Sequence, residues 1–145
     1  TYLKKGYSPE WVNQRLKSIE IRKALTDEWE KRGVKEGLEF AILTDEITEA
    51  WTGLTTKQYK NLKGLKKENL RDNMTNLELV LNMLAETATT EISEKREPRN
   101  MPEHRHVARE GGTVAGNARK EIESKTGRRA ITSNNFRTAK RKKLK

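Results

Sequence analysis

Residues 75–96 read TNLELVLNMLAETATTEISEKR, and this stretch predicts the most clearly defined helix of the chain. Thr75 and Glu78 match the capping box S/T-x-x-E, in which each side chain satisfies a free backbone amide at the start of a helix. Met74, just before the cap, can pack on Leu79 as a hydrophobic staple. Apolar residues then recur at helical spacing, at Leu77, Val80, Leu81, Leu84, Ala88 and Ile92. We expect this stripe to face the core.

Two further helices are expected upstream. Residues 8–10 read SPE, a helix entrance with a hydroxyl N-cap, a proline in the first turn and an acid behind it. The pattern predicts a helix over 8–32 that ends at Gly33, with a break near residues 26–27 as the alternative. Residues 38–51 predict an amphipathic helix. One face of it is formed by Phe40, Leu43, Ile47 and Trp51.

Two short helices are expected between these elements and the helix over 75–96. Thr55 or Thr56 caps the first, which runs to about Leu62 and is stopped by Gly64. The second is expected over residues 66–72.

A last helix is expected over residues 103–125, after a proline-containing linker over 97–102. The segment Gly111–Gly112 would weaken an isolated helix by about 1 kcal/mol per glycine relative to alanine. A P-loop does not explain it, because Asn117 and Ala118 stand where that motif needs Lys and Ser/Thr. Small residues share a face, at Ala108, Gly112, Ala115, Gly116 and Ala118. We therefore expect a closely packed helix crossing.

These elements together predict an all-α protein with five or six helices and no strand pattern. We expect a helical core domain over residues 1–97, a basic helical extension over 98–136 and a basic tail over 137–145. The extension packs on the core or on a second copy of the chain, so a homodimer is one expectation. The three tryptophans, Trp11, Trp29 and Trp51, fall on the apolar helix faces, which favours a place in the core or in a dimer interface over base stacking.

Composition excludes several classes of protein. The chain has 145 residues and no cysteine, so disulfides and cysteine nucleophiles are excluded. Its longest apolar run is far below the roughly 20 residues that span a bilayer, and no signal peptide pattern appears. We therefore expect a cytoplasmic protein without membrane association. The chain begins at Thr1 rather than methionine, so an N-terminal domain can be missing.

The net charge of +10 is unevenly distributed. Residues 1–97 carry equal numbers of acids and bases, so residues 98–145 supply the whole excess. Within the first part, residues 57–71 hold six bases and one acid, whereas residues 24–56 are acidic. Long cations on short helices suit a phosphate backbone, which needs charge but no fixed base geometry. The alternative is that the basic segment pairs with the acidic block 27–49 of the same chain.

The expected nucleic-acid-binding residues therefore come from two places. The first set comes from the basic segment and comprises Lys57, Lys60, Lys63, Lys66, Lys67 and Arg71. The second set comes from the C-terminal part and comprises Arg119, Lys120, Arg128 and Arg129.

No catalytic constellation is identifiable, so we expect no enzyme activity, no cofactor and no metal. His104 and His106 resemble an H-x-H metal pair, but on a helix residues i and i+2 point apart. No third ligand is evident for them. Glu91 beside Thr89 and Thr90 has no partner that would make it an acid or base.

Three long strings carry a family resemblance. They are GYSPEWVNQRLKSIEIRKALTDEW at 6–29, KGLKKENLRDNMTNLEL at 63–79 and AREGGTVAGNARKEIESKTGR at 108–128. They resemble the C-terminal region of BRO-family proteins, which carry a Bro-N domain and are often called phage antirepressors. DNA-damage-inducible protein D is related to them. The resemblance covers about residues 1–135 and implies a regulator of prophage or stress-response type, without assigned catalytic residues.

Residues and resemblance together predict a non-enzymatic, antirepressor-like regulator that contacts DNA phosphates through basic helices. One alternative is a protein-binding module that inhibits a repressor or a recombinase. The other is a dimerisation domain for an absent Bro-N domain.

Overall fold

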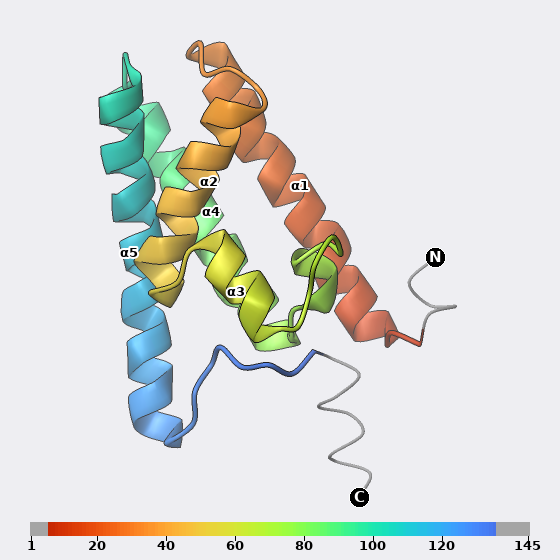
Figure 1. Cartoon of the computed structure of the whole chain (residues 1–145). Coiled ribbons are helices and arrows are strands. Elements are labelled where there is room, and N and C mark those ends of the chain that lie inside the picture. The colour runs from red at the N-terminus through yellow and green to blue at the C-terminus, as the bar shows by residue number, and fades with distance from the viewer. Residues whose placement is uncertain (1–5, 136–145) are drawn as a thin grey trace, which may run out of the picture.

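The computed structural model describes residues 6–135, and in this part of the chain all regular elements are helices, without strands. Its elements are α1 (Pro9–Lys31), α2 (Leu38–Thr52), α3 (Thr56–Leu62), the 3-10 turn η1 (Arg71–Asn73), α4 (Asn76–Arg96) and α5 (Met101–Thr126). Helix α4 packs against both α1 and α5, and α2 packs mainly against α5 and less extensively against α4 (Figure 1). None of the helices described combines the length and apolar character of a bilayer crossing.

The predicted long helices are confirmed. Helix α1 is continuous, without the break considered near residues 26–27, and the Ser8 hydroxyl caps it by accepting from the Trp11 amide at 3.1 Å. Helix α4 has the predicted capping box, because Thr75 Oγ1 accepts from the Glu78 amide and the Glu78 carboxylate accepts from the Thr75 amide.

The prediction of a second short helix over residues 66–72 is wrong. Only the turn η1 forms there, because local side chains take the backbone amides that a helix would use. The Glu68 carboxylate accepts from the amides of Lys66 and Lys67 at 3.2 and 3.0 Å. The Asn69 side chain accepts from the Asp72 amide at 3.2 Å. The basic segment is therefore a short helix followed by an irregular loop.

Helix α5 begins at Met101, earlier than predicted, because Asn100 caps it by accepting from the Glu103 amide. Its glycines allow the predicted close crossing. A Cβ on Gly111 would lie 1.9 Å from Thr89 Oγ1, and one on Gly112 would lie 2.6 Å from the Ile47 carbonyl oxygen. Helix α5 thus packs on α4 and α2 of its own chain.

The core joins residues from both predicted parts of the chain. Trp11, Trp29 and Trp51 are buried in it, together with Ala108 and Ala115 of α5. Of the two places expected for the tryptophans, the core is confirmed. The predicted division into a 1–97 domain and a 98–136 extension stays a prediction.

The prediction that the apolar stripe of α4 faces the core is wrong for half of the residues in the stripe. Leu77, Val80 and Leu84 are 36%, 40% and 38% exposed. The face of α4 that enters the protein carries polar residues instead, namely Glu78, Asn82, Glu86, Thr89 and Ser93. The apolar residues buried beside this polar row are Leu79, Leu81 and Ala85. Helix α4 therefore contributes a row of buried polar groups to the interior.

Candidate nucleic-acid interface

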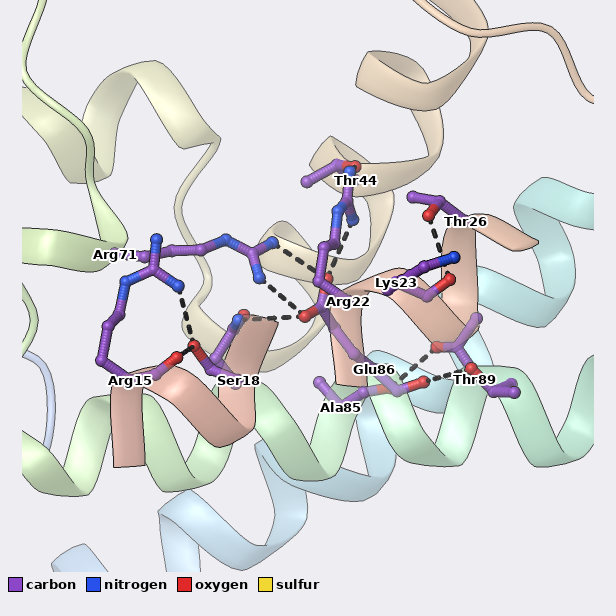
Figure 2. A network of polar contacts seen from close by, with 12 residues as sticks. Arg15, Ser18, Arg22, Lys23, Thr26, Thr44, Arg71, Ala85, Glu86 and Thr89 are labelled. Carbon is purple, nitrogen blue, oxygen red and sulfur yellow. Dashed lines mark hydrogen bonds and ion pairs between the residues drawn. The ribbon is translucent and has the colours of Figure 1, made fainter. Parts of the chain in front are cut away.

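Glu86 of α4 is almost completely buried and is held by two arginines from other elements, as Figure 2 shows. Arg71 of η1 donates through both Nη atoms to the carboxylate oxygens at 2.7 and 2.9 Å, and Arg22 of α1 donates through Nη1 at 2.9 Å. Burial alone raises the pKa of Glu86, but the two guanidinium charges outweigh it and hold this pKa below its ordinary value. One positive charge of the cluster has no carboxylate of its own.

Glu78, the capping residue of α4, forms a second buried cluster. Lys63 Nζ lies 2.5 Å from Glu78 Oε1, and the Tyr59 hydroxyl donates to Glu78 Oε2. Lys63 also donates to the Asn134 carbonyl, which fixes the segment after α5 near α3. Burial lowers the pKa of Lys63 and raises that of Tyr59 well above its ordinary value. The lysine ammonium therefore neutralises a carboxylate inside the protein.

Three of the predicted nucleic-acid-binding residues are engaged in this way. The side chain of Lys63 is 1% exposed and that of Arg71 is 18% exposed. Arg119 donates through Nε to the Trp51 carbonyl at 2.7 Å and pairs with Glu123 at 2.6 Å. We therefore do not count these three among the surface cations, because each already binds a carboxylate of the protein, although Arg71 shares Glu86 with Arg22.

The other seven predicted residues face solvent in whole or in part. They are Lys57, Lys60, Lys66, Lys67, Lys120, Arg128 and Arg129. Within residues 6–135, none of them forms an ion pair with a carboxylate. The last three lie on the final turns of α5 and just after it, and the predicted tail over 137–145 lies outside the described residues.

Two adjoining hollows lie between α2 and the chain from α3 to η1, and we call them together the basic groove. The larger has a volume of about 750 Å³ and is lined by Lys57, Lys60, Lys66, Arg22, Phe40 and Leu65, among others. The smaller has a volume of about 350 Å³, and Lys67 and Arg71 line it. Thr44, Thr56 and Lys60 line both hollows. The groove thus brings the four unpaired lysines of the basic segment to one recess.

The carboxylates that line this groove bind backbone amides rather than lysines. Asp45 Oδ1 accepts from the Thr56 amide at 3.2 Å, and Glu68 accepts from the two lysine amides described above. The Thr56 hydroxyl is enclosed and has no hydrogen-bond partner in the described part of the chain. The groove therefore remains positive in sum, because its six lysines and arginines outnumber these two carboxylates.

The acidic block 27–49 is not the partner of the basic segment. Glu46 pairs with Arg105 and Arg109 of α5 at 2.7 and 3.3 Å, and Glu28 pairs with Arg32. Between the two segments, both of which are fully described, no ion pair is formed. The expected alternative is thus corrected: the buried cations of the basic segment are neutralised by α4.

The two histidines have separate environments. His106 Nε2 lies 2.6 Å from Glu110 Oε1 on the surface of α5. His104 is 2% exposed, and neither of its ring nitrogens has a hydrogen-bond partner among the described residues. No group of three or more His, Asp or Glu suited to a metal ion occurs in residues 6–135.

The burial of His104 predicts a loss of stability in mild acid. Burial is the main cause that lowers the pKa of His104 from the ordinary 6.5, and the positive charge of Arg32 lowers it further. The negative charge of Glu28 raises this pKa in part, and Glu103 and Glu39 raise it more weakly. The unfolded chain therefore binds a proton near pH 6.5 that the folded chain refuses. Above that pH we expect the free energy of unfolding to have its highest value. As the pH decreases below 6.5, this free energy should decrease by up to about 1.4 kcal/mol per pH unit, until the pH reaches the pKa of His104 in the folded protein.

Urea unfolding of the wild type and of His104→Leu at pH 7.5 and 5.5 measures this effect. The difference between the two pH values should shrink in His104→Leu but persist in the control His106→Gln. An equal pH dependence in all three proteins would show that His104 does not cause it.

Comparison with known proteins gives one match. No curated protein and no solved structure matches the chain significantly. The family model of the DinD C-terminal domain matches residues 11–141, which is most of the chain and includes the basic groove and all five α-helices except the first residues of α1. This match supports the relation to DNA-damage-inducible protein D, while the relation to Bro-N antirepressors stays a prediction. The chain belongs to the DinD C-terminal domain family, a family linked to DNA damage.

Proposed function

We propose that the protein is a non-enzymatic, DNA-associated regulator of the DNA-damage response that holds a nucleic-acid backbone in the basic groove. The observation that carries this proposal is the allocation of charge in residues 57–71. The carboxylates of α4 bind the inward cations Lys63 and Arg71. The outward lysines form no ion pair with a carboxylate of the described residues and line one recess. Unpaired lysines that follow a groove are suited to phosphates.

Salt dependence of DNA binding tests this proposal. With four phosphate contacts, the slope of log K against log salt is expected to be about −4 on duplex DNA and about −3 on single strands. Affinity for a labelled duplex should therefore fall about 100-fold between 50 and 200 mM salt. The variant Lys57→Gln/Lys60→Gln/Lys66→Gln/Lys67→Gln should lose this binding, as measured by fluorescence anisotropy.

A matched control removes the same charge elsewhere. Lys17, Lys31, Lys35 and Lys95 are exposed and lie outside the groove. Their replacement by glutamine changes the net charge equally and should leave most of the binding intact. If both quadruple variants lose affinity to the same extent, the groove has no special role and the proposal is wrong.

A second candidate function is protein binding, of a repressor, a recombinase or a second copy of the chain. The observation that favours it is the exposed apolar row of Leu77, Val80 and Leu84 on α4. Residues at such spacing are the anchors with which a helix docks on a partner. Sedimentation of the wild type and of Leu77→Gln/Leu84→Gln would reveal a dimer that depends on this row.

A further inference from the structure

The basic groove has features that a simple phosphate-binding surface does not need. A duplex presents its phosphates on the outside and keeps its bases stacked within, so a protein that binds it through phosphates alone needs only surface cations. Here the cations surround a recess of about 750 Å³. That size falls within the range of pockets that enclose small organic ligands. The recess has room for part of a ligand.

The lining of the larger hollow is divided in character. Phe40, Ala41 and Leu65 supply apolar surface, while three lysines and Arg22 supply positive charge that exceeds the one negative charge of Asp45. The Phe40 ring is half-buried and packs at 5.3 Å from the Trp29 ring, which holds it in place. Proteins that bind single strands combine a basic groove with aromatic rings on which bases stack. The occupant therefore has both a flat apolar part and an anionic part.

Polar groups suited to such a ligand lie where the two hollows meet. Thr44 and Thr56 line both hollows, although the Thr56 hydroxyl itself is enclosed. Arg22 donates to Thr44 Oγ1 at 2.8 Å as well as to Glu86, and its side chain remains 26% exposed. Because Glu86 is shared with Arg71, this cluster has one positive charge in excess. A phosphate at this point would balance it.

We infer that the basic groove takes up single-stranded DNA, with one unpaired base against Phe40 and Leu65 and the adjoining phosphates on the lysines and Arg22. This inference rests on the proposed function, since it specifies which form of DNA the same groove binds. A base inside a duplex is not available without being flipped out of its stack, so paired DNA can use only the charged rim. The groove thereby distinguishes unpaired from paired strands.

Fluorescence anisotropy with a labelled 12-nucleotide single strand and its duplex tests the inference on the full chain. We expect the single strand to bind at least tenfold more tightly than the duplex at equal salt. Phe40→Leu keeps an apolar side chain on Trp29 but removes the ring, and should weaken single-strand binding about tenfold, within the range of one base stack. Its duplex affinity should not change.

A second variant guards against a folding defect of Phe40→Leu. Ala41 is exposed in the larger hollow, and Ala41→Leu narrows that space without changing charge. The matched control is Ala24→Leu, at an exposed alanine of α1 outside the groove. Of these two variants, only Ala41→Leu should weaken single-strand binding, and Ala24→Leu should leave it unchanged.

The outcomes separate this inference from the proposed function. If duplex and single strand bind equally, and the quadruple lysine variant loses both, the groove binds phosphates and the inference about unpaired bases is overturned. If neither form binds the wild-type protein, both statements are wrong. A tenfold preference that Phe40→Leu and Ala41→Leu abolish supports both.

Discussion

Replacing Glu86 by leucine is expected to destabilise the protein by about 3–5 kcal/mol, the usual cost of removing one partner from a buried ion pair. The cost arises because Arg22 and Arg71, which are only 26% and 18% exposed, would then face each other without the buried carboxylate between them. Urea unfolding measures it through the shift in the midpoint at constant slope. The control is Glu91→Leu, at an exposed position of the same helix, which should change the stability by less than about 0.5 kcal/mol.

Removing the whole cluster should cost far less than removing its centre. In Glu86→Leu/Arg22→Met/Arg71→Met no buried charge is left unpaired, and such apolar replacements are often neutral or stabilising. We therefore expect the triple variant to regain most of the lost stability. A triple variant as unstable as Glu86→Leu would mean that packing, rather than charge, determines the effect.

Gly111→Ala should destabilise the protein by about 2 kcal/mol, although alanine is the better helix former by about 1 kcal/mol. The added methyl group would meet Thr89 Oγ1 at 1.9 Å and the Thr89 backbone at 2.7 Å, so that α5 and α4 must move apart. Overpacking of this kind typically costs 1–3 kcal/mol, and because the contact is with backbone we expect a cost of about 3 kcal/mol or more here. The gain in helix propensity of about 1 kcal/mol reduces the net loss to about 2 kcal/mol. Thermal unfolding gives the change in stability.

The matched control is Asn117→Ala on the exposed face of α5, where only helix propensity acts. This control should be neutral or slightly stabilising. If Gly111→Ala behaved like the control, the close approach of α4 and α5 would not contribute to the fold.

Local signals in the sequence predicted most of the secondary structure. The capping boxes, the Pro9 entrance and the glycine stops depend on residues within a few positions of each other, so the bounds of α1, α2, α3 and α4 were largely predictable. The loop over 66–70 was not, because a helical spacing of lysines does not reveal that Glu68 and Asn69 bind the backbone amides instead.

The orientation of α4 was not predictable for a different reason. Its inward polar residues are satisfied by partners distant in sequence, such as Glu86 by Arg22 and Ser93 by Glu28. Without those partners in view, Leu77, Val80 and Leu84 form the more convincing core face. A buried carboxylate gives no signal in a single sequence until its cation is known.

The candidate site was predicted in outline and not in detail. The density of lysines identified the basic segment over residues 57–71. However, Lys60 and Lys63 lie one helical turn apart and have opposite environments. Lys63 points to the buried Glu78, while Lys60 lines the groove. Which of the two is free depends on how α3 is rotated about its axis relative to α4. The spacing of Thr44, Phe40 and Arg22 around the groove also arises only when α1 and α2 are in place.

The position of α5 has a consequence for biosynthesis. This helix closes the structure by packing on α2 and α4, yet among the described elements it is the last to be made. A growing polypeptide that has emerged from the ribosome only as far as α4 leaves the surface around Ile47 and Thr89 uncovered. Chains in this state expose apolar surface and tend to aggregate. Synthesis of residues 101–126 is thus the step at which the nascent chain gains its protected interior.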